Sequence, residues 1–77
     1  MNTWIQYTYR DGELTSTLER TADDMVRMLA QMHFLRQADE DITVGIGAED
    51  ELFNITCYTV HRRYKDEEVY YRFELKQ

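Results

Sequence analysis

Few side chains in this 77-residue chain could act as nucleophiles or bases, and they are scattered. Ser16 lies in an alternating stretch without the Gly-x-Ser-x-Gly turn that exposes a catalytic serine. Cys57 lies in an alternating apolar pattern, and neither residue has a histidine and an acid at a recognisable spacing. We therefore predict no catalytic residues and a protein that is not an enzyme.

The histidines, the glycines and the single cysteine also form no cofactor or metal motif. His33 falls at the border of the apolar side of a helix, and His61 falls on the outward side of a strand, so both are expected to be ordinary structural residues. Gly45-x-Gly47 is not followed by a helix, as a phosphate-binding loop would be. One cysteine excludes an internal disulfide, and with two histidines it disfavours a zinc site. We predict no metal and no cofactor.

Acidic residues gather at three connections, Asp39-Glu40-Asp41, Glu49-Asp50-Glu51 and Asp66-Glu67-Glu68. Such clusters usually serve only to keep a protein soluble. The cluster Asp39-Glu40-Asp41, however, follows the C-terminal end of a helix, where the helix dipole disfavours negative charge. The first and third clusters are expected at the same end of the sheet. Together they would present six carboxylates to a basic partner: Asp39, Glu40, Asp41, Asp66, Glu67 and Glu68. A row of carboxylates can imitate nucleic-acid phosphates.

A second candidate surface mixes cations with aromatic rings near the C-terminus, as in proteins that bind single strands by stacking. Its residues are Arg62, Arg63, Lys65, Tyr70 and Arg72. Arg63, Tyr70 and Arg72 are expected to share the outer face of the last hairpin with His61. The net charge of -6 and the neighbouring acids disfavour phosphate binding, so simple cross-strand packing is the alternative explanation.

Phe34 and Trp4 are aromatic residues on faces that the pattern assigns to solvent. Either ring could fold back over a neighbour. If they stay exposed, they are the candidate anchors of a protein interface, because aromatic residues are enriched at interface hot spots.

The helix that organises these surfaces is predicted at about 22–38, where apolar residues recur at helical spacing. Thr21 is its expected N-cap, and Asp23 and Asp24 complement the positive end of the helix dipole. The residues on its core-facing side are Met25, Met28, Leu29, Met32 and Leu35.

Alternating residues on either side of Asp11-Gly12 predict a hairpin with a type I′ turn, since both turn residues tolerate positive φ. Tyr9 would oppose Leu14, and Ile5 would oppose Leu18. The apolar side of this hairpin, which is expected to face the core, consists of Ile5, Tyr7, Tyr9, Leu14 and Leu18.

Three further strands follow the helix. Ile46 is expected opposite Phe53 across a four-residue loop, and a change of phase predicts a bulge near Thr56 to Tyr58. After a turn at Lys65 to Glu68, the last strand would place Val69 opposite Tyr64. Its core-facing residues would be Val69, Tyr71, Phe73 and Leu75.

This order of elements predicts an α+β fold, with a five-stranded antiparallel sheet (β-β-α-β-β-β order) and one helix packed on one face. Residues 1–77 are expected to form a single compact domain with a small core. No apolar run reaches the roughly 20 residues of a membrane span, and the N-terminus lacks a signal-peptide pattern. We therefore expect a cytoplasmic protein that does not bind a membrane.

In size, in charge and in its lack of catalytic residues, the chain resembles the small inhibitors that phages and mobile elements make against host nucleases and defence complexes, including anti-CRISPR proteins. The resemblance implies a non-enzymatic protein-binding domain, an inhibitor or adaptor, that engages a basic partner such as a nucleic-acid-binding host protein by nucleic-acid mimicry. One alternative is a nucleic-acid-binding accessory protein that uses the C-terminal hairpin. Another is a homodimeric structural or assembly subunit, because one helix covers only part of five strands.

Overall fold

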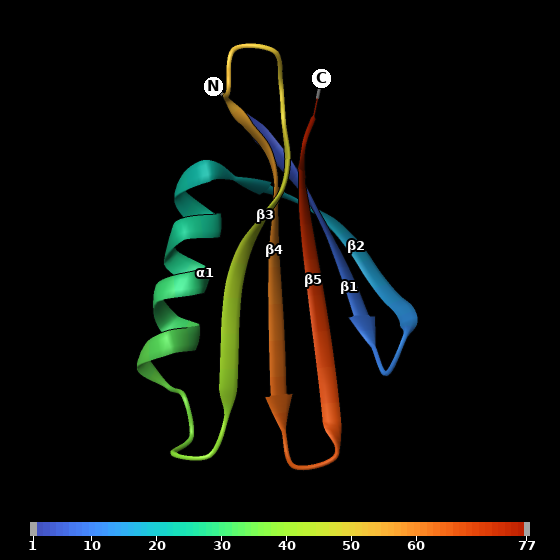
Figure 1. Cartoon of the computed structure of the whole chain (residues 1–77), viewed down its shortest axis with the longest axis vertical. Coiled ribbons are helices and arrows are strands. Elements are labelled where there is room, and N and C mark those ends of the chain that lie inside the picture. The colour runs from blue at the N-terminus through green and yellow to red at the C-terminus, as the bar shows by residue number, and fades with distance from the viewer. Residues whose placement is uncertain (1, 77) are drawn as a thin grey trace.

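The computed structural model describes residues 2–76, which form one antiparallel five-stranded sheet with a helix against one face (Figure 1). The strand order across the sheet is β2-β1-β5-β4-β3, so β2 and β3 are its edges. The predicted α+β class and element order are confirmed. The elements are β1 (Thr3–Arg10), β2 (Glu13–Thr21), α1 (Ala22–Phe34), β3 (Asp41–Glu49), β4 (Ile55–Tyr64) and β5 (Glu67–Leu75).

The helix α1 begins as predicted but ends four residues earlier than the expected residue 38. Thr21 Oγ1 accepts a hydrogen bond from the Asp24 N–H at 3.1 Å, which confirms the N-cap. At the other end, the Leu35 N–H still bonds to the Gln31 carbonyl, but the chain then turns toward the side chain of Glu40. Within residues 2–76, no helix is long and apolar enough to cross a membrane.

The core lies between α1 and the sheet face that α1 covers. Trp4 pairs with Leu75 and Gln6 pairs with Phe73, so the even-numbered side chains of β1 face the helix. The prediction that Ile5, Tyr7 and Tyr9 face the core is therefore wrong. The buried apolar residues of the core are Trp4, Met25, Met32, Val60, Val69, Tyr71 and Phe73.

Hydrogen bonding explains why the polar side of β1 can face the core. Arg20 Nε donates to Gln6 Oε1 at 2.8 Å, and Gln6 Nε2 donates to Thr8 Oγ1 at 2.9 Å. A buried polar group that keeps its hydrogen bonds carries little penalty. Trp4 then enters the core, with its ring centroid 5.4 Å from that of Tyr58. The alternation of inward and outward side chains in β1 was predicted correctly, but the even-numbered residues face the core instead of the odd-numbered ones.

The first hairpin has the predicted turn, with φ of 49° at Asp11 and 86° at Gly12. Tyr9 opposes Leu14 as expected. A bulge then shifts the register by one residue, so that Ile5 opposes Glu19 and not Leu18.

The hairpin of β3 and β4 differs from the expected register. Ile46 opposes Tyr58 and not Phe53, because Asp50 to Asn54 form a longer loop. The ladder is irregular between Ile46 and Glu49, opposite residues 55–58, which confirms the predicted place of the bulge.

The last hairpin closes with a two-residue turn, since Tyr64 opposes Glu67 and Val69 opposes Arg62. The expected register was therefore wrong by two residues. A shift of two leaves every side chain on its predicted face, because side chains alternate with a period of two.

Candidate functional site

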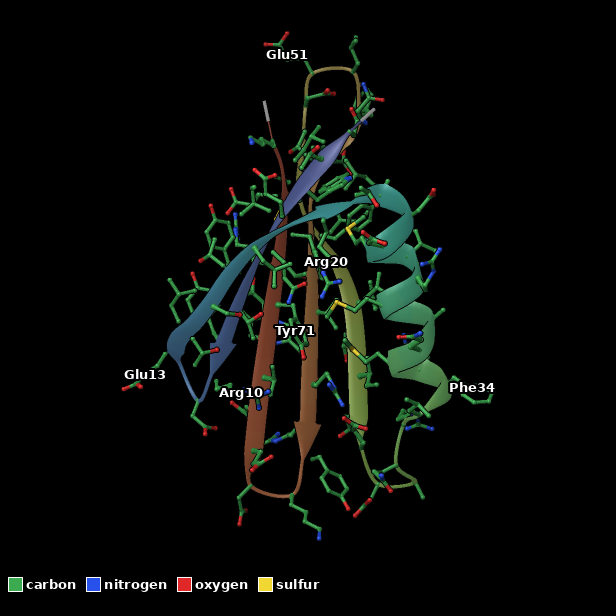
Figure 2. All side chains as sticks on the ribbon, turned by 180° about the vertical axis from the view of Figure 1, so that it is seen from behind. Arg10, Glu13, Arg20, Phe34, Glu51 and Tyr71 are labelled. Carbon is green, nitrogen blue, oxygen red and sulfur yellow. The ribbon has the colours of Figure 1, made fainter. Side chains whose placement is uncertain are left out.

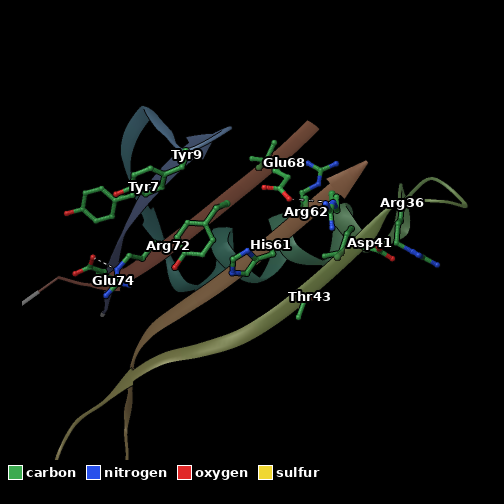
Figure 3. A pocket seen from close by; sticks show the side chains of 15 residues that line it. Tyr7, Tyr9, Arg36, Asp41, Thr43, His61, Arg62, Glu68, Arg72 and Glu74 are labelled. Carbon is green, nitrogen blue, oxygen red and sulfur yellow. Dashed lines mark hydrogen bonds and ion pairs between the residues drawn. The ribbon is translucent and has the colours of Figure 1, made fainter. Parts of the chain in front are cut away.

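The open face of the sheet, opposite α1, is hollowed into a trough of about 1030 Å³ (Figure 3). Four rings from three neighbouring strands line it: Tyr7 and Tyr9 from β1, Tyr70 from β5 and His61 from β4. The Tyr70 ring is central, with its centroid 5.8 Å from that of Tyr9 and 4.5 Å from that of His61. A row of three rings therefore crosses three strands. We call this surface the open-face trough.

Charged side chains of both signs border these rings. Arg72 Nε donates to Glu74 Oε2 at 2.7 Å, and Arg63 Nε lies 3.4 Å from Glu68 Oε1. The hydrogen bond to Glu74, together with one to Tyr70, raises the pKa of Arg72 above its usual value. The trough is not acidic although the protein carries a net charge of -6. Its bordering charges are Arg36, Arg62, Arg63 and Arg72 against Asp41, Glu68 and Glu74, and Arg62 is itself paired with Glu40.

The trough contains part of the predicted cation and aromatic surface. The β4–β5 register confirms that Arg63, Tyr70, His61 and Arg72 share the outer face of the last hairpin. Lys65 lies in the turn, with Nζ 5.2 Å from the centroid of the Tyr64 ring, outside this row.

Arg62, the remaining member of the predicted cationic surface, forms a partly buried ion pair with Glu40, although it also borders the open-face trough. Its Nε and Nη2 donate to Glu40 Oε2 at 3.0 and 2.7 Å, and its Nη1 donates to the Tyr71 hydroxyl at 3.4 Å. Burial lowers the pKa of Arg62, but the bonds to Tyr71 and Glu40 outweigh burial and raise it. Because Arg62 already pairs with Glu40, the prediction that it binds nucleic acid gains no support from this geometry.

Glu40 is the buried partner of this pair and also organises the connection between α1 and β3. Its Oε1 accepts from the Gln37 N–H at 3.2 Å, and its carbonyl accepts from Arg36 Nη1 at 2.7 Å. Burial raises the pKa of Glu40, but the hydrogen bonds from Arg62 and Gln37 and the charges of Arg62 and Arg36 outweigh burial and lower it. Glu40 cannot contribute to an acidic docking surface.

The other carboxylates of the predicted acidic surface are exposed. The α1–β3 and β4–β5 connections lie at the same end of the sheet, as expected (Figure 1). Asp41 opposes Arg63 on the open face, and Glu68 also pairs with Arg63. Two of the remaining carboxylates therefore belong to the trough. The exposed members of the set are Asp39, Asp41, Asp66, Glu67 and Glu68.

The two predicted aromatic anchors have different positions. Trp4 is buried in the core, so its expected role as an exposed anchor is wrong. Phe34 is 88% exposed at the last position of α1 and points away from the sheet (Figure 2).

An exposed apolar pair that was not identified from the sequence lies in the β3–β4 loop. Leu52 and Phe53 are both exposed at its tip, and Phe53 has a φ of 64°. Asp50 holds the loop by accepting hydrogen bonds from the N–H groups of Leu52 and Asn54 at 2.8 and 2.9 Å. The bonds from Asn54 and Leu52 lower the pKa of Asp50 against a smaller effect of burial. An aspartate whose side chain accepts from the backbone two residues further on, as Asp50 does from Leu52, is a common turn signal.

The thiol of Cys57 is buried, and burial raises its pKa, so it is not poised as a nucleophile. A Cβ added to Gly47 would lie 2.7 Å from Cys57 Sγ, so β3 can cover the thiol only because residue 47 is glycine. Among residues 2–76, no group of three or more histidine, cysteine, aspartate or glutamate side chains is placed to hold a metal ion.

Comparison with known proteins identifies no relative: no family model matches the chain, and neither the curated proteins nor the solved structures gave a significant match.

Proposed function

We propose that this protein is a non-enzymatic protein-binding domain, an inhibitor or adaptor, and that it holds a segment of its partner in the open-face trough. The observation that carries the proposal is the row of rings formed by Tyr9, Tyr70 and His61 in the open-face trough. Tyrosine and arginine are enriched at interface hot spots because they combine apolar area with hydrogen bonding. Arg72, beside Tyr70, completes this combination.

The charges favour a protein over a polyanion as the ligand. Arg72 and Arg63 already pair with Glu74 and Glu68, so a phosphate would compete with carboxylates for both. A protein segment can instead offer positively and negatively charged side chains to the Arg72–Glu74 and Arg63–Glu68 ion pairs. The net charge of -6 favours a basic partner, and the exposed carboxylates beside the trough would speed the encounter.

The shape of the trough favours an extended segment over a second copy of the same face. Two identical concave faces would meet at their rims and leave the rings without a partner. A protruding strand or loop would fill the hollow and contact the rings directly. The homodimer hypothesis therefore gains no support from this face.

The test is a quantitative pull-down with tagged protein and an extract of the cells in which it is naturally made. Wild type is compared with Tyr70→Ala and Arg72→Ala, and Tyr64→Ala serves as the matched control. Tyr64 is a half-buried tyrosine on the opposite face. We expect partners that the wild type and Tyr64→Ala retain to be lost from both trough variants. Equal recovery in all four samples would contradict the proposal.

A second candidate function is the binding of single-stranded nucleic acid, because the same rings could stack on bases while Arg63 and Arg72 contact phosphates. Titration of labelled single-stranded oligonucleotides at low and moderate salt tests it. Binding that Arg63→Ala weakens, with a reduced dependence on salt, would favour this function over a protein ligand. Absence of binding at low salt would eliminate it.

A further inference from the structure

The two edges of the sheet differ in how they are protected against pairing with another strand. The β2 edge has a bulge next to Leu14 and carries Glu19 and Arg20. In β3, residues 42–48 carry no charged side chain, and although the ladder is irregular between Ile46 and Glu49, it is regular from the Asp41 pair to the Ile46 pair. Natural proteins usually guard an edge with charges, proline or bulges, because its free N–H and C=O groups accept another strand.

The side chains of β3 suit an added strand on both faces. Val44 and Ile46 lie on the helix side, opposite Val60 and Tyr58, yet they remain 44% and 56% exposed. On the open side, Gly45 has no side chain to obstruct a neighbouring strand. Figures 1 and 2, which look along one axis from opposite sides, draw α1 toward the β3 border of the sheet. A strand placed along β3 would therefore have apolar side chains next to half of its residues.

We infer that β3 is a docking edge for an extended segment of another protein, which adds a sixth strand to the sheet. Backbone hydrogen bonds would hold the segment, and alternate apolar residues would face Val44 and Ile46. Asp41 and Glu49 stand at the two ends of β3, so the segment carries lysine or arginine at its ends. This site shares Asp41 with the border of the open-face trough, but it uses the backbone edge of β3 and does not rest on the function proposed for the trough.

A second copy of this chain suits the same edge less well than a strand without an attached helix. Antiparallel pairing of two β3 strands about a two-fold axis puts both α1 helices on one face of the joined sheet. Paired strands are about 4.8 Å apart, whereas packed helices need about 8–10 Å between their axes. Figure 1 draws α1 on the β3 side of the sheet, so this pairing would bring the two helices toward each other. A strand without an attached helix avoids this crowding.

The test uses a synthetic peptide, Lys-Thr-Val-Thr-Val-Thr-Val-Thr-Lys, titrated into the 15N-labelled protein and followed by NMR. We expect amide shifts and slower hydrogen exchange along β3, and binding about tenfold weaker or more in Val44→Lys, which adds an edge-guarding charge. Thr17→Lys, with the same change of charge on the β2 edge, should bind like the wild type. If Val44→Lys fails to fold, Val44→Thr takes its place and should also weaken binding.

Three outcomes would overturn the inference. The first is the absence of β3 shifts at millimolar peptide. The second is equal binding of a control peptide in which prolines replace one threonine and an adjacent valine, since one of these two positions must donate its N–H to β3 and proline cannot. The third is a set of shifts confined to Tyr9, Tyr70 and their neighbours, which would assign the peptide to the trough.

Discussion

Replacing Glu40 by glutamine removes one negative charge and nearly preserves the shape of the side chain, so the change reports on the ion pair with Arg62. The Glu40 side chain is 5% exposed and that of Arg62 is 32% exposed. Two N–H groups of Arg62 and the Gln37 N–H donate to the carboxylate. The substitution should therefore weaken the link between the α1–β3 connection and β4.

The magnitude follows from the burial of the pair. Removing one member of a buried ion pair costs about 3–5 kcal/mol of unfolding free energy. Arg62 keeps some contact with water, and a glutamine oxygen can still accept one bond. We therefore expect a loss of about 2–3 kcal/mol for Glu40→Gln. In a domain of this size, such a loss lowers Tm by roughly 10–20 °C.

Urea and thermal unfolding at pH 7, followed by circular dichroism, measure this loss. The matched control is Glu68→Gln, because the Arg63–Glu68 pair has side chains 69% and 63% exposed. An exposed pair contributes about 0–1 kcal/mol, so the control should change little. Equal losses in the two variants would refute the reasoning that burial makes the Glu40 pair strong.

The pH dependence gives an independent check. The folded pKa of Glu40 lies below its usual value, since the bonds from Arg62 and Gln37 outweigh the effect of burial. Stabilisation by a carboxylate with a lowered pKa is complete above the unfolded pKa of about 4.3 and is lost as the pH falls through the folded pKa. The difference in unfolding free energy between wild type and Glu40→Gln should stay constant near neutral pH and shrink in acid. A difference that grows in acid would contradict this assignment.

Four further predictions concern the core and the loops. Gly47→Ala should lower the unfolding free energy by about 1–3 kcal/mol in urea titrations, because the added Cβ would lie 2.7 Å from Cys57 Sγ. The double variant Gly47→Ala/Cys57→Ala lacks this sulfur and should regain part of the lost stability. Trp4→Ala should cost about 3–5 kcal/mol, and wild-type tryptophan fluorescence should move to longer wavelength on unfolding. Burial raises the pKa of Cys57, so a thiol reagent such as DTNB should react slowly with the native protein and rapidly in urea. Phe53→Gly should raise the unfolding free energy by about 0.5 kcal/mol, because it relieves a φ of 64° at an exposed side chain; a lower Tm would show that the ring is held by contacts.

The features of the fold that local chemistry determines could be predicted from the sequence. The Asp11-Gly12 turn and the Thr21 cap each depend on a few adjacent residues, and both are confirmed. The phase of β1 could not be predicted in this way. It depends on Arg20, which is on a neighbouring strand and satisfies Gln6, so that the polar side of β1 can be buried. Residue types in β1 alone favour the opposite assignment.

The same distinction applies to the candidate site. Tyr70, Arg72 and their neighbours on the last hairpin were placed on one face because the apolar side of β5 fixes the alternation. Tyr7 and Tyr9 were missed because tyrosine suits a core and a binding face equally well. The burial of Glu40 depends on Arg62, 22 residues further along the chain, so no local pattern separates it from its exposed acidic neighbours.

The most direct test of the open-face trough as the binding surface is photo-crosslinking at single positions. A photoreactive p-benzoylphenylalanine would replace Tyr70 in the trough or Tyr64 on the opposite face, in the cells in which the protein is naturally made. We predict a covalent adduct with a partner protein from position 70 and none from position 64. An adduct from position 64 alone, or equal adducts from both positions, would contradict the proposal that the partner lies in the trough.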